Sequence, residues 1–260
     1  MITLELIRKY FPPNVRHNSL YYKYMLKEYL QLLILDHLSN SAHIQKLSFI
    51  GGTHLRLLLG INRFSEDLDF DCKEFGQNEF RQMTDDIAGY LRLNGFRVEA
   101  KESESDRLSA FRCNYYFPEF MFEMGLSGHR EARFLIKVEA QDQQVDYHSE
   151  IHFIKGCGFF FPFPAPAANV ICSMKILAML NRQKGRDFYD VMFLLAQTQP
   201  DYAFLSQKTG ISNLHELKAR ITDSIRKVDL KEKRKDFEHL LINKEDSRKI
   251  LYFKEFINEL

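Results

Sequence analysis

The chain has 260 residues, of which 45% are hydrophobic and 27% are charged, a composition that is ordinary for a globular protein with a substantial core. Its formal net charge of +1 neither favours nor excludes nucleic acid as a partner, so any basic surface has to be local. No apolar run approaches the ~20 residues of a membrane span, no signal peptide opens the chain, and the four cysteines lack the CxxC spacing of zinc sites. We therefore expect a cytoplasmic protein with no membrane partner and with reduced cysteines.

The segment 47–71 has the most informative pattern in the chain. A short apolar run is followed by Gly51 and Gly52, by leucines at helical spacing, by a polar loop, and finally by acidic and apolar residues that alternate from Asp67 to Asp71. This order predicts a strand, a glycine turn, a helix, a loop and a second strand. The glycines would let the backbone approach a ligand closely, and the first N–H groups of the helix would favour a phosphate.

Residues two apart on a strand share a face, so Asp67, Asp69 and Asp71 are expected to project to the same side. Three carboxylates on one face repel one another unless a positive charge lies among them. Mg²⁺ is the usual cation in such a place, because it takes oxygen ligands and bridges to substrate phosphates. A pair of aspartates on a strand is often only part of a solvated sheet face, and a glycine pair is often a plain turn. Their order and spacing together favour chemistry on a nucleotide.

Gly52 and Thr53, followed by Asp67 and Asp69, resemble the GS…DxD signature of the nucleotidyltransferase superfamily, with Thr53 in place of the usual serine. The fuller pattern, GGT-L-R-L with RFSEDLDF, is similar to one branch of that superfamily, the AbiEii/AbiGii toxin family of bacterial toxin–antitoxin and phage-defence systems.

Two later motifs extend the resemblance over most of the chain. Lys175, in the string KILA, and the string RDFYD at 186–190 are similar to the lysine and RDxxD motifs of that family. The similarity runs from about residue 47 to about residue 195.

The resemblance implies an α+β fold, in which a polymerase β-like nucleotidyltransferase domain with a mixed sheet and flanking helices is followed by an all-helical C-terminal domain. The sequence agrees with this division, because strand-like alternation ends at a segment rich in proline and glycine, 156–169, and helical periodicity follows it. We therefore expect a nucleotidyltransferase domain over 1–160 and a helical domain over 161–260.

The activity that the resemblance implies is the Mg²⁺-dependent transfer of a nucleoside monophosphate from an NTP to an acceptor hydroxyl, with one or two Mg²⁺ ions. RNA, and tRNA in particular, is the acceptor class that the family suggests first, and the protein would act as a toxin that a partner antitoxin neutralises. A hydroxyl of a protein or of a small molecule is the alternative acceptor. A nucleotide-binding module without catalysis is the alternative function.

The resemblance also assigns roles to residues of this sequence. The expected catalytic residues are Asp67, Asp69, Lys175 and Asp187. The expected nucleotide-binding residues are Gly51, Gly52, Thr53, Arg63, Ser65 and Lys175. The expected metal ligands are Asp67, Asp69 and Glu139.

Simpler interpretations exist for three of these residues. Glu139 lies on a predicted strand over 133–140 and could pair with Lys137 on an exposed sheet face instead of binding a metal. Lys175 and Asp187 could form an ordinary salt bridge at the surface or between helices, which contributes little to stability.

Overall fold

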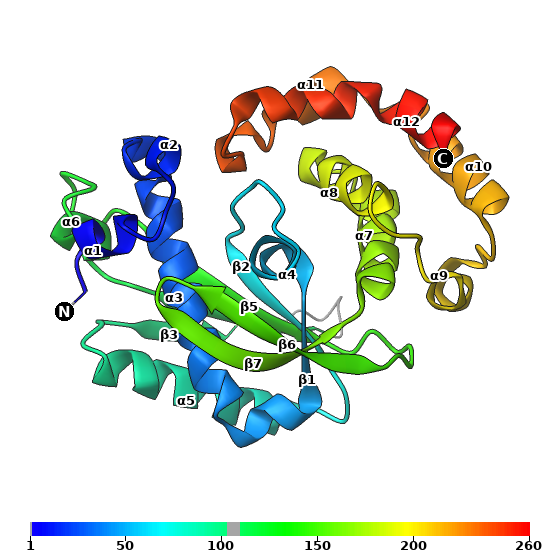
Figure 1. Cartoon of the computed structure of the whole chain (residues 1–260). Helices are drawn as coiled ribbons and strands as arrows, with labels where there is room; N and C mark the ends of the chain where they lie inside the picture. The colour runs from blue at the N-terminus through cyan, green and yellow to red at the C-terminus, as the bar shows by residue number, and fades with distance from the viewer. Residues whose placement is uncertain (1, 103–109) are drawn as a thin grey trace. The chain divides into compact units, whose positions relative to one another are not determined.

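The structure, a computed structural model, describes residues 2–102 and 110–260 (Figure 1). The chain divides into two compact units, and both contain short segments that are distant in sequence from the rest of the unit. The first unit consists of Met1–Leu59, Phe64–Gln143 and Ile151–Ala165, and the second consists of Gly60–Arg63, Gln144–Glu150 and Pro166–Leu260.

A five-stranded mixed sheet forms the centre of the first unit, with the strand order β1-β2-β5-β4-β3. Neighbouring strands are antiparallel except for β2 and β5, which are parallel. The strands are β1 (Leu47–Ile50), β2 (Asp67–Cys72), β3 (Glu99–Glu102), β4 (Ala110–Tyr116) and β5 (Leu135–Gln141). A mixed sheet combined with helices confirms the predicted α+β class.

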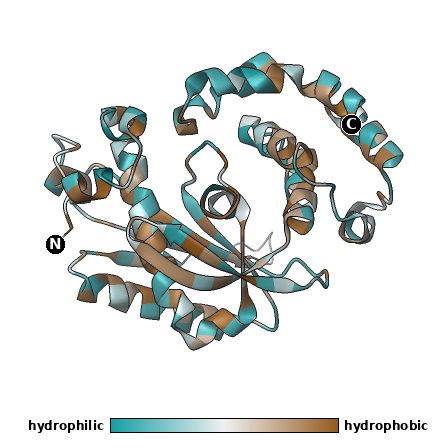
Figure 2. Ribbon diagram, in the orientation of Figure 1, coloured by the Kyte–Doolittle hydropathy of each residue, from teal (hydrophilic) through white to brown (hydrophobic). Residues whose placement is uncertain are grey.

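Helices accompany this sheet, and two of them, α3 and α5, are long and contact its strands. On α5 the buried residues Phe80, Met83, Ile87 and Leu91 recur every three or four positions, so one side of the helix is apolar. Figure 2 shows the resulting mixture of hydrophobic and hydrophilic residues along α5. The helices of this unit are α1 (Leu4–Arg8), α2 (Pro13–Arg16), α3 (Tyr22–Ser39), α4 (Gly51–Leu57), α5 (Gln77–Leu93) and α6 (Phe120–Glu123), with 3-10 turns at Ser19–Tyr21 and Ala42–Lys46.

The structure confirms the strand, turn, helix, loop and strand predicted for 47–71. The chain passes from β1 directly into α4 at Gly51 and returns through a loop to β2. β2 then pairs with β1 on one side and with β5 on the other, so that it lies in the interior of the sheet.

A separate two-stranded sheet pairs β6 (Ser149–Gly156) with β7 (Phe159–Pro166). β7 occupies the proline-rich segment in which we expected only a break in regular structure. The N–H groups of residues two apart point to the same edge of a strand, so Pro162, Pro164 and Pro166 remove donors from one edge only. Among the strands that the structure describes, β7 has a neighbour at one edge only, and the other edge needs no donors.

Three phenylalanines join this small sheet to the large one. The ring centroids of Phe49, Phe70 and Phe163 are 5.8 to 6.0 Å apart, and the three side chains are at most 1% exposed. Burial of such rings is among the largest apolar contributions that single residues make to folding.

The second unit is helical from Ala168 to its end. Its helices are α7 (Ala168–Arg182), α8 (Gly185–Leu195), α9 (Tyr202–Thr209), α10 (Leu214–Ser224), α11 (Leu230–Lys235) and α12 (Phe253–Glu259), with 3-10 segments at Glu238–Leu240 and Lys244–Tyr252. Within the described ranges, no helix combines the length and the apolar character that crossing a membrane requires.

Replacement of Phe163 by alanine should lower the free energy of unfolding by about 3–5 kcal/mol, because it removes a fully buried ring and leaves a cavity between Phe49 and Phe70. Phe160→Ala, on the same strand, is the matched control, because the Phe160 ring is 66% exposed and should contribute little. Urea unfolding followed by circular dichroism measures both. Equal losses in the two variants would show that this cluster does not carry the stability assigned to it.

Candidate functional site

Asp67 and Asp69 project from the same face of β2. Leu68 and Phe70, which alternate with them, point into the core and are at most 1% exposed, whereas Asp67 and Asp69 remain partly exposed. The third acid of the strand, Asp71, is buried, and its carboxylate accepts a hydrogen bond of 2.8 Å from the backbone N–H of Gln143. Asp71 is therefore part of the packed end of the strand, and Asp67 and Asp69 are the acids that a ligand can reach.

Gly51 is the residue on which the Asp69 side chain rests. Gly51 has a φ of +84°, a conformation that favours glycine. A Cβ atom at this position would lie 2.7 Å from the Asp69 Cβ and Cγ atoms and would overlap the carboxylate itself. In this structure it is Asp69 that approaches Gly51 closely, and the glycine fixes where that carboxylate lies.

Thr53 and Ser65 are buried and hold the start of β2 in place. Thr53 is fully buried, and its hydroxyl donates a short hydrogen bond to the backbone carbonyl of Asp67. The Gln31 side-chain amide on α3 donates to the Ser65 carbonyl at 3.2 Å and contacts the Thr53 hydroxyl at 3.5 Å. These contacts connect the helix after the glycine turn to the strand that carries the acids.

On β5, Lys137 and Glu139 lie beside the two acids. The parallel register pairs Asp67 with Lys137 and Asp69 with Glu139. The Lys137 ammonium lies 3.2 Å from Asp67 Oδ2 and 2.7 Å from Glu139 Oε2, and the Arg112 guanidinium on β4 pairs with the other oxygen of Glu139. The face therefore carries alternating charges that compensate one another, and it includes the Lys137–Glu139 pair that the sequence allowed as an alternative.

The titration behaviour of this group follows from these contacts. Burial alone would lower the pKa of Lys137, but Asp67 and Glu139 raise it above its ordinary value. Burial alone would raise the pKa of Glu139, but Lys137 and Arg112 hold it below its ordinary value. Both side chains are therefore charged at neutral pH.

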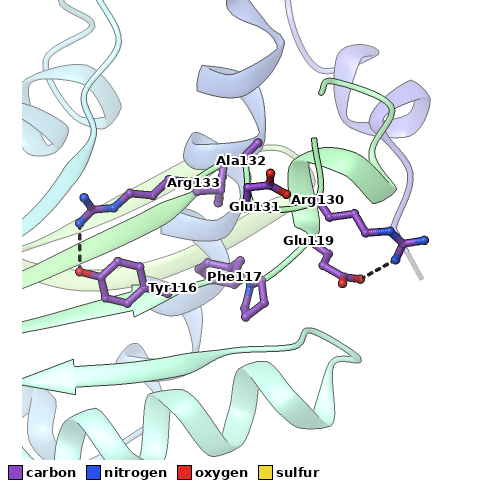
Figure 3. A pocket seen from close by; sticks show the side chains of 9 residues that line it. Tyr116, Phe117, Glu119, Arg130, Glu131, Ala132 and Arg133 are labelled. Atoms are coloured by element: carbon purple, nitrogen blue, oxygen red, sulfur yellow. Dashed lines mark hydrogen bonds and ion pairs between the residues drawn. The ribbon is translucent and has the colours of Figure 1, made fainter. Parts of the chain in front are cut away.

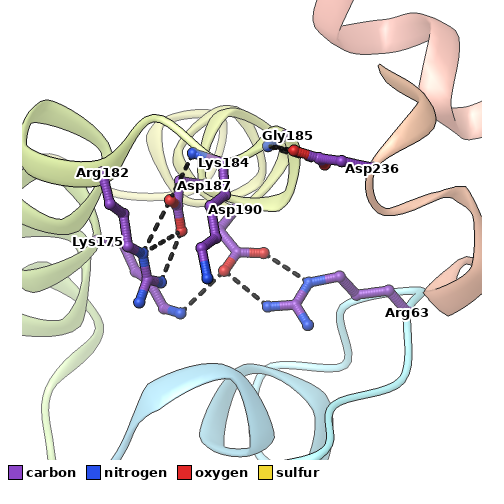
Figure 4. A network of polar contacts seen from close by, with 8 residues as sticks. All are labelled: Arg63, Lys175, Arg182, Lys184, Gly185, Asp187, Asp190 and Asp236. Carbon is purple, nitrogen blue, oxygen red and sulfur yellow. Dashed lines mark hydrogen bonds and ion pairs between the residues drawn. The ribbon is translucent and has the colours of Figure 1, made fainter. Parts of the chain in front are cut away.

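In the second unit, Arg63 and Lys175 converge on one carboxylate, that of Asp190 on α8 (Figure 4). Arg63 makes two hydrogen bonds of 2.7 Å to the two oxygens of Asp190, and the Lys175 ammonium lies 2.9 Å from Oδ2. Asp190 is fully buried, Arg63 is 1% exposed and Lys175 is 7% exposed. A bidentate guanidinium–carboxylate pair of this kind is strong and directional, and here it lies out of water.

Each charge in this group depends on the others. Burial would raise the pKa of Asp190, but Arg63 and Lys175 lower it to about 2. Burial lowers the pKa of Lys175, Asp190 opposes that shift, and the neighbouring Arg63 adds to it. The pKa of Lys175 is therefore lowered, and its contact with Asp190 fixes the direction of its ammonium group.

Asp187 has a different set of partners from the one that we expected. Its carboxylate accepts hydrogen bonds of 2.7 to 3.1 Å from the Arg182 guanidinium, and one of 3.0 Å from the backbone N–H of Lys184 at the start of α8. The N–H of Gly185 donates to the Asp236 carboxylate at 3.0 Å. Asp187 thus caps α8 and joins it to the end of α7, and Asp190 is the acid that contacts Lys175.

The structure places the predicted residues in two groups. The first unit brings together Gly51, Asp67, Asp69 and Glu139, and the second brings together Arg63 and Lys175. Sequence reasoning missed two charged residues that complete these groups, Arg112 and Asp190. For Asp190 a signal was present, because it is the last acid of the RDxxD string; for Arg112 there was none without the register of β4.

Replacement of Asp190 by asparagine should destabilise the chain by about 3–5 kcal/mol, because it leaves two buried cations without their counter-charge. Asp223→Asn is the control, because Asp223 pairs with Arg226 at the surface, where such pairs contribute little. Thermal and urea unfolding at neutral pH measure the difference. An Asp190→Asn protein as stable as the control would contradict the assignment.

The pH dependence of the same comparison provides a second check. The pKa of Asp190 in the folded chain, about 2, lies below the ordinary value of ~3.9, so its contribution to stability is present above about pH 4 and is lost as the pH falls through about 2. The stability difference between the wild type and Asp190→Asn should therefore shrink over that range.

A family model described as nucleotidyl transferase AbiEii toxin, Type IV TA system, matches residues 33–253 of this chain. Two solved structures share its fold. MenT4, the nucleotidyltransferase toxin Rv2826c from Mycobacterium tuberculosis H37Rv, is 18% identical over 100% of this chain and 91% of its own, with a TM-score of 0.62. JHP933 from Helicobacter pylori is 19% identical over 91% of this chain and 92% of its own, with a TM-score of 0.55.

No curated protein matches the sequence. The structural likeness confirms the predicted fold as that of nucleotidyltransferase toxins, and the family model covers most of the chain, including both groups of charged residues. The chain therefore belongs to the AbiEii family of nucleotidyltransferase toxins of type IV toxin–antitoxin systems.

Proposed function

We propose that this nucleotidyltransferase moves a nucleoside monophosphate from an NTP to a hydroxyl of an RNA acceptor, with Mg²⁺ as its cofactor. In such a reaction the hydroxyl oxygen forms a bond to the α-phosphorus as the bond to pyrophosphate breaks. The observation that carries the proposal is the pair of carboxylates on one strand face, Asp67 and Asp69, with the second of them fixed against Gly51.

The side chains on this face fit a hard divalent cation. Mg²⁺ is usually held by one or two carboxylates together with waters and substrate phosphates. Asp67 and Asp69 supply two carboxylates, and no group of three acidic, histidine or cysteine side chains within the described ranges forms a ready-made metal cluster. The phosphates of the nucleotide would then complete the coordination. When bound, Mg²⁺ would neutralise phosphate charge and make the acceptor hydroxyl easier to deprotonate.

The residues of the first unit have different roles in binding the cation and the nucleotide. Asp67 and Asp69 would hold the cation, and Glu139 would become a third ligand only if it exchanged Lys137 or Arg112 for the metal. The backbone at Gly51 and Gly52 is our candidate for contact with the nucleotide phosphates. Because Thr53 and Ser65 are buried, they would serve nucleotide binding indirectly, Thr53 through its bond to the Asp67 carbonyl and Ser65 through the bond that its own carbonyl accepts from Gln31.

In the second unit, Lys175 is the candidate ligand for a nucleotide phosphate. Its ammonium is directed by Asp190, whose carboxylate is itself held by Arg63. Because both oxygens of Asp190 accept bonds from Arg63, this arginine acts on the nucleotide through Asp190. Asp187 acts by fixing the start of α8, the helix that carries Asp190.

RNA is the acceptor that we propose, with tRNA as the first class to test, and a cognate antitoxin is the expected protein partner. The type IV toxin–antitoxin family of the chain implies the antitoxin, and RNA is the acceptor class that the sequence resemblance suggests first. A hydroxyl of a protein or of a small molecule, or binding of the nucleotide without transfer, would appear as a distinct outcome of the first experiment below.

Asp69→Asn should reduce nucleotide transfer by at least about a hundredfold and leave the fold intact, because it removes a metal-binding charge without changing the side-chain volume. The measurement is incubation of the protein with each α-labelled NTP, Mg²⁺ and total cellular RNA and protein, followed by separation of the labelled fractions. Asp85→Asn is the control, since Asp85 is exposed on α5. Undiminished transfer by folded Asp69→Asn would refute the site. Label in protein or in small molecules would refute the RNA acceptor, and no label in any fraction would favour binding alone.

Lys137→Met should increase the affinity of the nucleotide-free protein for Mn²⁺ by about tenfold, because the methionine removes a positive charge 3.2 Å from Asp67 that opposes the entry of a cation. Titration calorimetry with Mn²⁺ alone measures this, independently of any transfer activity. Lys46→Met, which removes a lysine paired with Glu79, is the control and should change nothing. Weaker binding by Lys137→Met would show that Lys137 organises the acids for the metal and does not compete with it.

A further inference from the structure

A pocket that the proposed catalytic residues do not line opens where β4 ends and β5 begins (Figure 3). Its volume is about 480 Å³, within the range of small-molecule sites. The lining residues that matter for its chemistry are Tyr116, Phe117, Glu119, Arg130 and Arg133.

The Tyr116 ring forms a flat part of the pocket wall, and two cationic side chains lie over this ring. The Arg133 Cζ atom is 5.1 Å from the ring centroid and the Lys101 Nζ atom is 5.2 Å from it. Arg133 also donates a hydrogen bond of 3.0 Å to the Tyr116 hydroxyl. Among the described residues no carboxylate pairs with Arg133, which is exposed, so its guanidinium can form a further contact with a ligand.

The other side of the pocket carries both hydrogen-bond donors and hydrogen-bond acceptors. The Glu119 carboxylate lies 3.2 Å from both the Arg130 and the Arg97 guanidinium groups. Glu119 has a φ of +59°, a left-handed conformation that is uncommon outside glycine. Donors and acceptors beside a flat ring suit the edge of a nucleobase, which presents both, better than they suit a bare phosphate.

The position of Tyr116 relates this pocket to the acids. Across the sheet, Asp67 is paired with Lys137 and Lys137 with Asn114, and Tyr116 follows two residues after Asn114 on the same face. Strand geometry places Tyr116 about 7 Å further along the strands and about 10 Å across them from Asp67. A short single-stranded stretch of nucleic acid can span that separation.

We propose that this pocket is a nucleobase subsite for the acceptor RNA strand, in which a base next to the reacting end stacks on Tyr116 and Arg133 contacts the base or its phosphate. The inference rests on the proposed function, because it assumes that the acceptor is RNA. Stacking on aromatic rings and guanidinium planes is the usual way in which proteins hold unpaired bases. The proposed stacking therefore implies that the protein binds single-stranded RNA more tightly than duplex RNA.

The test is the binding of a fluorescently labelled single-stranded RNA oligonucleotide to the full chain, measured by anisotropy without NTP or metal. Tyr116→Ala should weaken binding by about tenfold or more, while Tyr116→Phe, which keeps the ring, should stay close to the wild type. Arg133→Gln should weaken binding and reduce its salt dependence. Arg248→Gln removes an exposed arginine elsewhere and serves as the control. Thermal unfolding confirms that each variant is folded.

Further measurements separate the possible results. The binding assay contains neither NTP nor metal, so its result is independent of whether the protein transfers nucleotides. Unchanged RNA binding by folded Tyr116→Ala would overturn the inference whatever the catalytic result. Weakened binding of a fluorescent NTP by Tyr116→Ala, with RNA binding unchanged, would assign the pocket to the incoming nucleotide and would also overturn it. Equal affinity for single-stranded and duplex RNA would overturn the stacking arrangement.

Discussion

The contact between the Asp69 carboxylate and Gly51 is the constraint on which the proposed chemistry depends. An acid that must help to hold a cation needs a fixed position, and here the backbone of a neighbouring turn provides it, since no side chain larger than hydrogen fits beneath the carboxylate. The glycine turn and the acidic strand are adjacent in sequence, and β1 and β2 pair so that Ile50, the residue before the turn, lies opposite Asp69. The glycine turn and the acidic strand therefore form one structural unit.

The second unit holds the buried Lys175 in a fixed direction beside a counter-charge. Burial disfavours the charged form of Lys175, and the carboxylate that it shares with Arg63 opposes this shift without cancelling it. Removing any member of such a group leaves the others uncompensated in a medium of low dielectric constant. Asp190, which is fully buried between two cations, is thus the member whose loss the unit tolerates least.

Much of this could be predicted from the sequence, and the failures have physical causes. Period-two alternation and the glycine pair were sufficient for β1, α4 and β2, because those signals are local. β7 was missed because prolines usually end a strand, and only the position of β7 at a sheet edge makes them acceptable. Asp190 was passed over for Asp187 because two acids one helical turn apart look equivalent until the partners of each are known. The role of Thr53 depended on a contact with the Asp67 carbonyl that no motif encodes.

The parallel register between β2 and β5 has a consequence for how the chain folds. In the native alignment Asp67 faces Lys137, which compensates it directly, and Asp69 faces Glu139, which is itself compensated by Lys137 and Arg112. A slip of one position would turn Asp67 and Asp69 toward the apolar interior. A slip of two would restore the correct side but would move Lys137 from its position opposite Asp67. The charges that prepare this face for a cation thus also favour the native register of β2 and β5 during folding.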